Sequence, residues 1–273
     1  QEFPLIHYVG RSSEYKPRLI EICWKHKKSQ PKPNIVIIGK GITFDSGGLD
    51  IKPSASMLLM KKDMGGSAIA LALAKTLITQ KFNINVRLII PIAENSISER
   101  SMRPLDIILS RNNTPIEIGN TDAEGRLILA DALSYSQEKI KPDLIIDFAT
   151  LTGAARVALG TEVPAVFSNN DKISKMLIDN AFKTVDPLWT LPLFVSYERH
   201  LENENGTISS TGFAGTGGAI TAALFLKKFI KKNTNWVHID LMGWNLNGRP
   251  GYPKGGEAMT FRAVLHTIKE LYS

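Results

Sequence analysis

The sequence has almost no cysteine, and Cys23 is the only one among 273 residues. A single cysteine excludes an internal disulfide and a thiolate metal cluster. We therefore expect the protein to work in a reducing compartment, which we take to be the cytoplasm. Histidine is scarce too, and the five histidines share no ligand-like spacing, which argues against a histidine-bound zinc site.

Long apolar segments and several familiar catalytic motifs are also missing. The longest uncharged run, Asn205 to Leu226, is rich in glycine, serine and threonine over its first half, so we expect no membrane span there. The sequence contains no His-Glu-x-x-His, no Gly-x-Ser-x-Gly and no Gly-x-Gly-x-x-Gly that opens a helix. These absences disfavour a membrane protein, a zincin protease, an α/β-hydrolase and a dinucleotide-binding enzyme.

The charge is basic, with a formal net charge of +7 and local lysine clusters at Lys25–Lys32 and Lys227–Lys232. Clusters of this kind are usually solvated surface, which is the interpretation we favour. Nucleic-acid binding is the alternative, and a salt-dependent binding assay would separate the two.

Apolar runs bounded by turn residues predict five buried strands: Ile35–Ile38, Val86–Ile92, Leu144–Phe148, Ala165–Phe167 and Trp236–Leu241. Helical periodicity predicts five helices: Ser67–Thr79, Leu127–Lys139, Ile173–Phe182, Ala219–Lys231 and Ala258–Leu271. Strands that alternate with helices indicate an α/β fold, with a mainly parallel mixed sheet and helices on both faces.

The chain shows no internal repeat and no composition shift that would mark a second domain boundary. We expect a linker segment over residues 1–33, with a short strand-like stretch at Arg18–Trp24, and one domain over residues 34–273. The stretch Asp106–Gly119 has two short apolar runs around a polar turn, which predicts a hairpin.

Three segments place carboxylates beside glycines at the ends of apolar runs: Gly39–Gly48, Lys62–Gly66 and Asn120–Arg126. In parallel α/β sheets, sites form outside the carboxyl ends of the strands, and glycine lets the backbone approach a ligand closely. One aspartate before a glycine is usually a turn or a cap. The joint occurrence of three such segments predicts that they meet in one place.

Asp45, Asp63, Asp122 and Glu124 would then bring four negative charges into one pocket. Like charges at close range raise carboxyl pKa values, and two divalent cations would neutralise the cluster. Oxygen ligands suit Zn²⁺, Mn²⁺ or Mg²⁺. The spacing of two between Asp122, Glu124 and Arg126 predicts an extended backbone with all three side chains on one side.

The segment Asn120–Leu127 matches the signature octapeptide of the leucine aminopeptidase (cytosol aminopeptidase) family. Gly39–Gly48 and Lys61–Ser67 resemble the other two metal-ligand segments of that family, in the same order. The similarity continues through Ala149–Ala154 and more loosely to the end of the chain. The resemblance implies a zinc-exopeptidase-like fold, with residues 34–273 as a metallo-aminopeptidase catalytic domain.

Carried over by position, the resemblance implies that Asp45 and Glu124 bridge two metal ions. Lys40 and Asp63 would complete the tighter metal site, and Asp122 the more exchangeable one. A lysine ligand must be neutral, and a shift of its pKa from about 10.4 to about 7 costs on the order of 4 to 5 kcal/mol. An adjacent dication and burial can supply that free energy.

The resemblance also implies that Lys52 and Arg126 are catalytic residues that do not bind metal. Lys52 would stabilise the negative charge of the tetrahedral intermediate. Arg126 would hold a bicarbonate ion that acts as the general base, because a guanidinium binds anions but is a poor proton acceptor.

By the same resemblance, Met60, Thr150 and Gly153 border the pocket for the first side chain, and the backbone of Leu151 contacts the substrate. The segment Asp240–Asn245 departs from the family pattern, so the preferred first residue stays open. The expected substrates are short peptides with a free amino terminus and a neutral first residue.

Members of the family typically carry a further amino-terminal domain and form hexamers of two stacked trimers. This chain begins almost at the catalytic domain, so we expect that domain to be absent here and the chain to form a homo-oligomer, a hexamer. A catalytically silent scaffold is a further alternative, disfavoured because all five ligand positions and both catalytic positions are filled.

Overall fold

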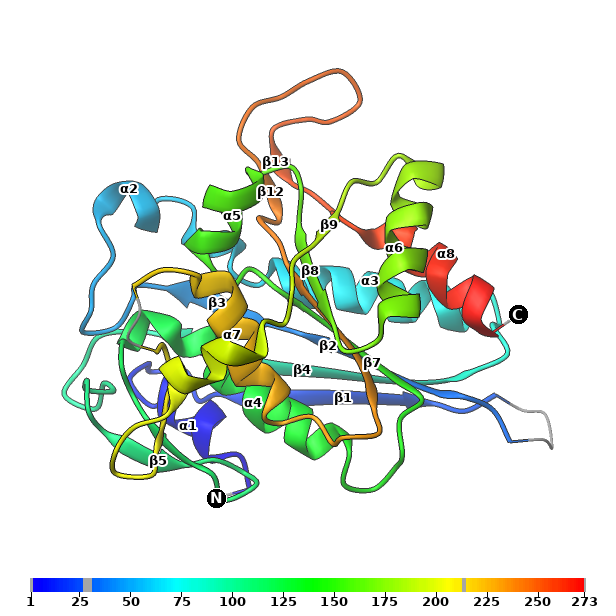
Figure 1. The fold of residues 1–273 in the computed structure, drawn as a ribbon. Helices are drawn as coiled ribbons and strands as arrows, with labels where there is room; N and C mark the ends of the chain where they lie inside the picture. The colour runs from blue at the N-terminus through cyan, green and yellow to red at the C-terminus, as the bar shows by residue number, and fades with distance from the viewer. Residues whose placement is uncertain (1, 27–30, 213–214, 273) are drawn as a thin grey trace.

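The computed structural model describes residues 2–26, 31–212 and 215–272. It has three layers, with helices on both faces of a central twisted sheet (Figure 1). The α/β fold expected from the sequence is therefore confirmed. Of the predicted lysine cluster at Lys25–Lys32, residues 27–30 lie outside the described residues.

The central sheet has the strand order β1-β4-β2-β7-β11-β8-β9, and β3 pairs with β4. Its strands are β1 (Arg18–Trp24), β2 (Asn34–Gly39), β3 (Gly41–Asp45), β4 (Asn85–Asn95), β7 (Leu144–Ala149), β8 (Ala165–Ser168), β9 (Trp189–Thr190) and β11 (Asn235–Asp240). Only β1 on β4 and β8 on β11 pair antiparallel among these described strands. The sheet is thus mainly parallel, and all five predicted strands are present.

The helices that cover one face of the sheet are α3 (Gly65–Thr79), α6 (Asp171–Thr184) and α8 (Phe261–Tyr272), and those on the other face are α1 (Pro4–Gly10), α4 (Glu124–Ser136) and α7 (Gly218–Lys227). Alternate side chains of each strand supply the two cores. In β2, for example, Ile35 and Ile37 pack toward α3, whereas Val36 and Ile38 pack toward α4.

Smaller elements surround the sheet: α2 (Ser54–Met57), α5 (Gly153–Leu159), the 3₁₀ helices η1 (Met60–Lys62), η2 (Thr121–Ala123) and η3 (Val195–Leu201), and the strands β5 (Ile107–Leu109), β6 (Pro115–Glu117), β10 (Ile208–Ser209), β12 (Trp244–Asn245) and β13 (Gly255–Gly256). The predicted hairpin is confirmed, since β5 pairs antiparallel with β6. Before residue 34, α1 packs on α4 and β1 forms an edge of the sheet. None of the helices in the described ranges has the length and apolarity needed to cross a lipid bilayer.

The predicted extended backbone from Asp122 to Arg126 is wrong. Asp122 lies in η2, and Glu124 begins α4, three residues before the predicted start of this helix. The Asn120 side chain accepts a hydrogen bond from the Asp122 backbone and so turns the chain into a helical path. On a helix, residues two apart point to different sides, so Arg126 diverges from Glu124.

Candidate metal centre

The three glycine-rich acidic segments meet at the carboxyl ends of β2 and β3, as predicted. Asp45 is the last residue of β3, Asp63 directly follows η1, and Glu124 is the first residue of α4. Asp45, Asp122 and Glu124 each offer a carboxylate oxygen, and these oxygens lie within 4.8 Å of one another. Carboxylate oxygens gathered in this way could hold a divalent ion.

Lys40 links the fourth carboxylate, that of Asp63, to these three. Its Nζ lies 2.8 Å from Asp63 Oδ2 and 2.8 Å from Glu124 Oε1, and it donates to the carbonyl of Thr150 at 3.0 Å. Burial by itself would lower the pKa of the Lys40 ammonium, but the Asp63 and Glu124 carboxylates outweigh burial and raise this pKa above its ordinary value. Lys40 is therefore a cation here, held at the centre of the cluster.

Lys52 makes the second set of ion pairs. Its Nζ lies 2.8 Å from Asp45 Oδ2 and also pairs with Asp122 Oδ1. Burial opposes the charge on Lys52, yet Asp45 and Asp122 raise the pKa of its ammonium above the ordinary value. Two lysines face four carboxylates, so the cluster keeps an excess of negative charge.

The carboxyl groups of the cluster differ in the direction of their pKa shifts. Burial raises the pKa of Glu124 to about 8, with Asp45 adding to the effect. Burial and Asp45 also raise the pKa of Asp122. The predicted upward shift does not extend to Asp45, because Lys40 and Lys52 overcome its burial and lower its pKa.

Buried neighbours that are not charged orient the carboxylates. Asn95, the last residue of β4, donates from Nδ2 to Asp45 Oδ1 at 2.8 Å and to the carbonyl of Thr121 at 3.1 Å. Thr150 donates from Oγ1 to Asp63 Oδ1 at 2.7 Å. Asn95 thus ties the segment of Asp45 to the segment of Asp122, although neither segment is its sequence neighbour.

Gly125 shows why glycine is needed inside the first turn of α4. A Cβ at this position would lie 2.7 Å from both Cε and Nζ of Lys40. The glycine therefore lets the helix approach Lys40, which brings Glu124 within reach of its ammonium.

Arg126 is buried on the same helix, directed away from Glu124. It donates from Nη1 to the carbonyl of Ser210 at 2.8 Å, while its Nε has no hydrogen-bond partner in the part of the chain that the structure describes. Burial lowers the pKa of Arg126 to about 10, so the guanidinium remains a cation at neutral pH. The Nε group of this buried cation, which has no partner among the described residues, suits a small anion.

Residues 1–265 match the cytosol aminopeptidase family, catalytic domain. The chain belongs to this family. It is 40% identical to a probable cytosol aminopeptidase of Chlamydia abortus, over 100% of this chain and 55% of that protein, and 44% identical to one of Persephonella marina, over 94% of this chain and 51% of that protein. The chain thus spans about half the length of these curated relatives.

Solved structures of other proteins have the same fold. The crystal structure of a cytosol aminopeptidase from Coxiella burnetii superposes with a TM-score of 0.95 at 50% identity, covering 100% of this chain and 59% of that one. The bottromycin maturation enzyme BotP in complex with Mn superposes with a TM-score of 0.92 at 33% identity, covering 100% of this chain and 60% of that one. The likeness extends across both faces of the sheet.

The residues predicted to contact substrate differ in their burial and in their contacts with the cluster. Thr150 touches both Lys40 and Asp63. Met60 is buried in η1, and its carbonyl accepts from the Asp63 backbone at 3.1 Å. Leu151 is partly buried, and Gly153 is exposed at the start of α5.

Sequence reasoning missed Asn95, and it missed Asp240, whose carboxylate accepts from the backbone amides of Leu151 and Thr152 beside Thr150. Both are polar residues at the carboxyl end of a buried strand, the signal that identified the other segments. Neither lies next to a glycine, so the pattern of a carboxylate beside glycine did not identify them.

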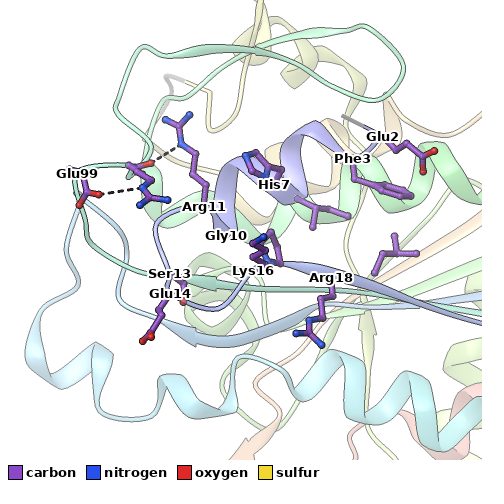
Figure 2. A pocket seen from close by; sticks show the side chains of 14 residues that line it. Glu2, Phe3, His7, Gly10, Arg11, Ser13, Glu14, Lys16, Arg18 and Glu99 are labelled. Carbon is purple, nitrogen blue, oxygen red and sulfur yellow. Dashed lines mark hydrogen bonds and ion pairs between the residues drawn. The ribbon is translucent and has the colours of Figure 1, made fainter.

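A cavity of about 840 Å³ lies elsewhere, between α1, the start of β1 and the loop at Glu99 (Figure 2). Its lining mixes basic and acidic side chains, including Arg11, Glu14 and Arg18, and none of the predicted site residues contributes to it. We therefore take the acidic cluster, where side chains that could hold a metal ion converge, as the candidate site.

Proposed function

We propose that this chain is the catalytic part of a metal-dependent aminopeptidase that removes the first residue from short peptides with a free amino terminus. Residues 34–273 would form the catalytic domain, and residues 1–33 would be an entry segment whose α1 and β1 pack against it. The observation that carries the proposal is the convergence of Asp45, Asp122 and Glu124, with Asp63 joined through Lys40, in one buried cluster. Membership in the cytosol aminopeptidase family supports the same reaction.

The side chains fit two divalent ions, for which Zn²⁺, Mn²⁺ and Mg²⁺ are the candidates. Glu124 Oε2 is buried and accepts no hydrogen bond from the described residues, which leaves it free to be a ligand. Asp45 and Glu124 would be shared by both ions, with Lys40 and Asp63 on one side and Asp122 on the other. Lys40 must release its proton to bind metal, so metal uptake would release protons.

When bound, two divalent ions would supply a Lewis acid for the scissile carbonyl and lower the pKa of a water molecule. Lys52 would contribute a hydrogen-bond donor for the oxygen that becomes negative in the transition state. Its raised pKa supports this role, because it keeps the ammonium protonated at neutral pH.

Arg126 would hold a bicarbonate ion, which provides general-base chemistry at that position. Its buried Nε without a partner among the described residues supports an anion there. Because the Nη1 group already donates to Ser210, the guanidinium is fixed in one orientation before any anion binds.

We propose that Met60, Thr150 and Gly153 border the pocket for the first side chain and that the backbone of Leu151 contacts the peptide. The position of Thr150 between Lys40 and Asp63 supports this arrangement. A neutral first residue is expected. We also propose that the enzyme works in the cytoplasm.

The test uses the purified chain, Mn²⁺ or Zn²⁺, and a leucine anilide beside its N-acetylated form. We expect release from the free amine only, loss of activity on chelation, and recovery when metal is restored. Asp122→Asn should abolish activity, whereas Asp179→Asn, an exposed carboxylate on α6 paired with Lys175, should not change it. Full activity after complete metal removal would refute the proposal.

A further inference from the structure

Asp240, the last residue of β11, holds the loop that joins β7 to α5. Its Oδ1 accepts from the backbone amides of Leu151 at 3.0 Å and Thr152 at 3.1 Å. Its Oδ2 accepts from the Thr152 amide at 3.1 Å and from the Thr152 hydroxyl at 2.6 Å. The carboxylate is buried, and hydrogen bonds to a buried charge are strong, so the loop is firmly attached to β11.

The same loop is fixed from its other side by the acidic cluster. The carbonyl of Thr150 accepts from Lys40 Nζ at 3.0 Å, and the amide of Leu151 donates to Asp240. These two groups belong to one trans peptide unit, in which they point in opposite directions. Lys40 and Asp240 therefore hold a single peptide plane at both ends.

The next peptide unit joins Leu151 to Thr152 and is also held by Asp240. Its amide, that of Thr152, donates to Asp240, so its carbonyl, that of Leu151, faces away from Asp240. The Thr152 hydroxyl also accepts from the Ala155 amide at 3.0 Å and caps α5, which begins at Gly153. Asp240 thus fixes the direction of the Leu151 carbonyl and the start of α5 together.

We infer that Asp240 is a positioning residue for the peptide substrate. It holds the Leu151 carbonyl, and with it Thr150 and Gly153, at a fixed place relative to the carboxylate cluster. Asp240 acts through the loop and contacts no reacting group itself. The inference rests on the proposed aminopeptidase function and adds a residue to its substrate side.

The first test compares peptide hydrolysis by Asp240→Asn and by the unaltered chain. The introduced NH₂ group accepts no hydrogen bond, so fewer acceptors face the amides of Leu151 and Thr152 and the loop is held less firmly. We expect kcat/KM to fall on the order of 10- to 100-fold, mostly through KM, because misplaced binding groups weaken productive binding. The content of divalent metal should stay unchanged, since Asp240 is not among the proposed ligands.

Asp147→Asn is the matched control. Asp147 is a fully buried carboxylate on the adjacent strand β7, and it binds Trp236 Nε1 at 2.7 Å and His238 Nδ1 at 2.5 Å instead of the loop backbone. This variant should lose stability but keep its KM at temperatures well below unfolding. Equal rises in KM for both variants, or a KM within about twofold of the unaltered chain for Asp240→Asn, would overturn the inference.

Amide hydrogen exchange gives a readout that does not require catalysis. In Asp240→Asn, exchange at Leu151 and Thr152 should accelerate by at least about tenfold, while Asp147→Asn leaves both amides protected. Unchanged protection would overturn the inference even if activity fell. If the unaltered chain hydrolysed no peptide with any metal, the proposed function would fail, and the exchange data would still show whether Asp240 holds the loop.

Discussion

Residues that are not proposed as metal ligands orient the carboxylates of the cluster. Asn95 is the clearest case, because its one amide group donates to Asp45 and to the carbonyl of Thr121. Partners that orient ligands in this way typically change metal affinity by about 10- to 100-fold when removed.

We expect Asn95→Ala to weaken Mn²⁺ binding by about 10- to 100-fold, measured by calorimetric titration. Asn85→Ala is the control, since Asn85 starts the same strand at its opposite end and bonds with Asn34 and His26. Its Mn²⁺ affinity should match that of the unaltered chain. Equal affinities for all three proteins would show that Asn95 does not orient Asp45.

A second prediction concerns two adjacent glycines at the start of α3. A Cβ at Gly66 would lie 2.1 Å from the carbonyl oxygen of Phe148 in β7, whereas one at Gly65 would first meet Thr150 Cγ2 at 3.4 Å. We expect Gly66→Ala to lower the free energy of unfolding by about 3 kcal/mol or more. Gly65→Ala should change it by less than about 1 kcal/mol. Urea unfolding of both variants measures the difference, and similar losses would contradict the close packing of α3 on β7.

Much of the site at this scale could be predicted from the sequence. Lys40, Asp45 and Asp63 lie in glycine-rich segments at strand ends, and a parallel sheet brings such ends together. Asn95 and Asp240 could not be found in this way. Their roles arise from contacts with residues about 50 and 90 positions away, and a polar residue at a strand end, with no glycine beside it, does not identify those contacts.

Among the elements, α1 is held against α4 by apolar packing and also by one carboxylate of α4. Asp131 Oδ2 accepts from the backbone amides of Leu5 at 2.8 Å and Ile6 at 3.2 Å, and Oδ1 accepts from the backbone amide of Arg111 at 3.0 Å. Burial raises the pKa of Asp131 from 3.8 to about 6, and these hydrogen bonds only partly oppose it. The protonated form is therefore favoured by folding.

The sign of the pH effect follows from that raised pKa. The contribution of Asp131 to stability is fully present below its unfolded pKa of 3.8 and is lost as the pH rises through about 6. The two pKa values differ by an amount equivalent to about 3 kcal/mol. Asp131→Asn removes this contribution, so the stability difference between the two proteins should shrink by up to about 3 kcal/mol between pH 4 and pH 7. Urea unfolding across that range measures it, and a constant difference would contradict the assignment.

The bounds of helices and strands could be predicted where the apolar pattern covers the same residues as the backbone hydrogen bonds. The strands β2, β4 and β7 are buried along most of their length, and their positions agree closely with the predicted ranges. The start of α4 was missed because its first turn is polar and contains Gly125, which resembles a loop until the Asn120 cap is seen. The end of α7 was predicted at Lys231 but lies at Lys227, because Phe229 and Ile230 continue the apolar pattern in a turn that is packed but not helical. Apolar periodicity reports burial and does not report hydrogen bonding.

At the scale of the whole molecule, we propose that chains associate into a homo-oligomer, with a hexamer as the expected state. Apolar side chains on and just before the β5 strand support association, since Leu105 is 72% exposed, Ile107 54% and Leu109 56%. Sedimentation of the purified chain should give a mass close to six chains of 30.1 kDa. A single 30.1 kDa species at all concentrations would contradict the proposal.

The acidic cluster is proposed as the place for two divalent ions, and the roles proposed for its residues depend on those ions. Anomalous diffraction from crystals soaked in Mn²⁺ tests this most directly, because it locates the ions independently of activity. We predict two peaks about 3.5 to 4 Å apart, both bordered by Asp45 and Glu124, with Lys40 and Asp63 beside one and Asp122 beside the other. A single peak at saturating Mn²⁺, or none among these carboxylates, would contradict the account.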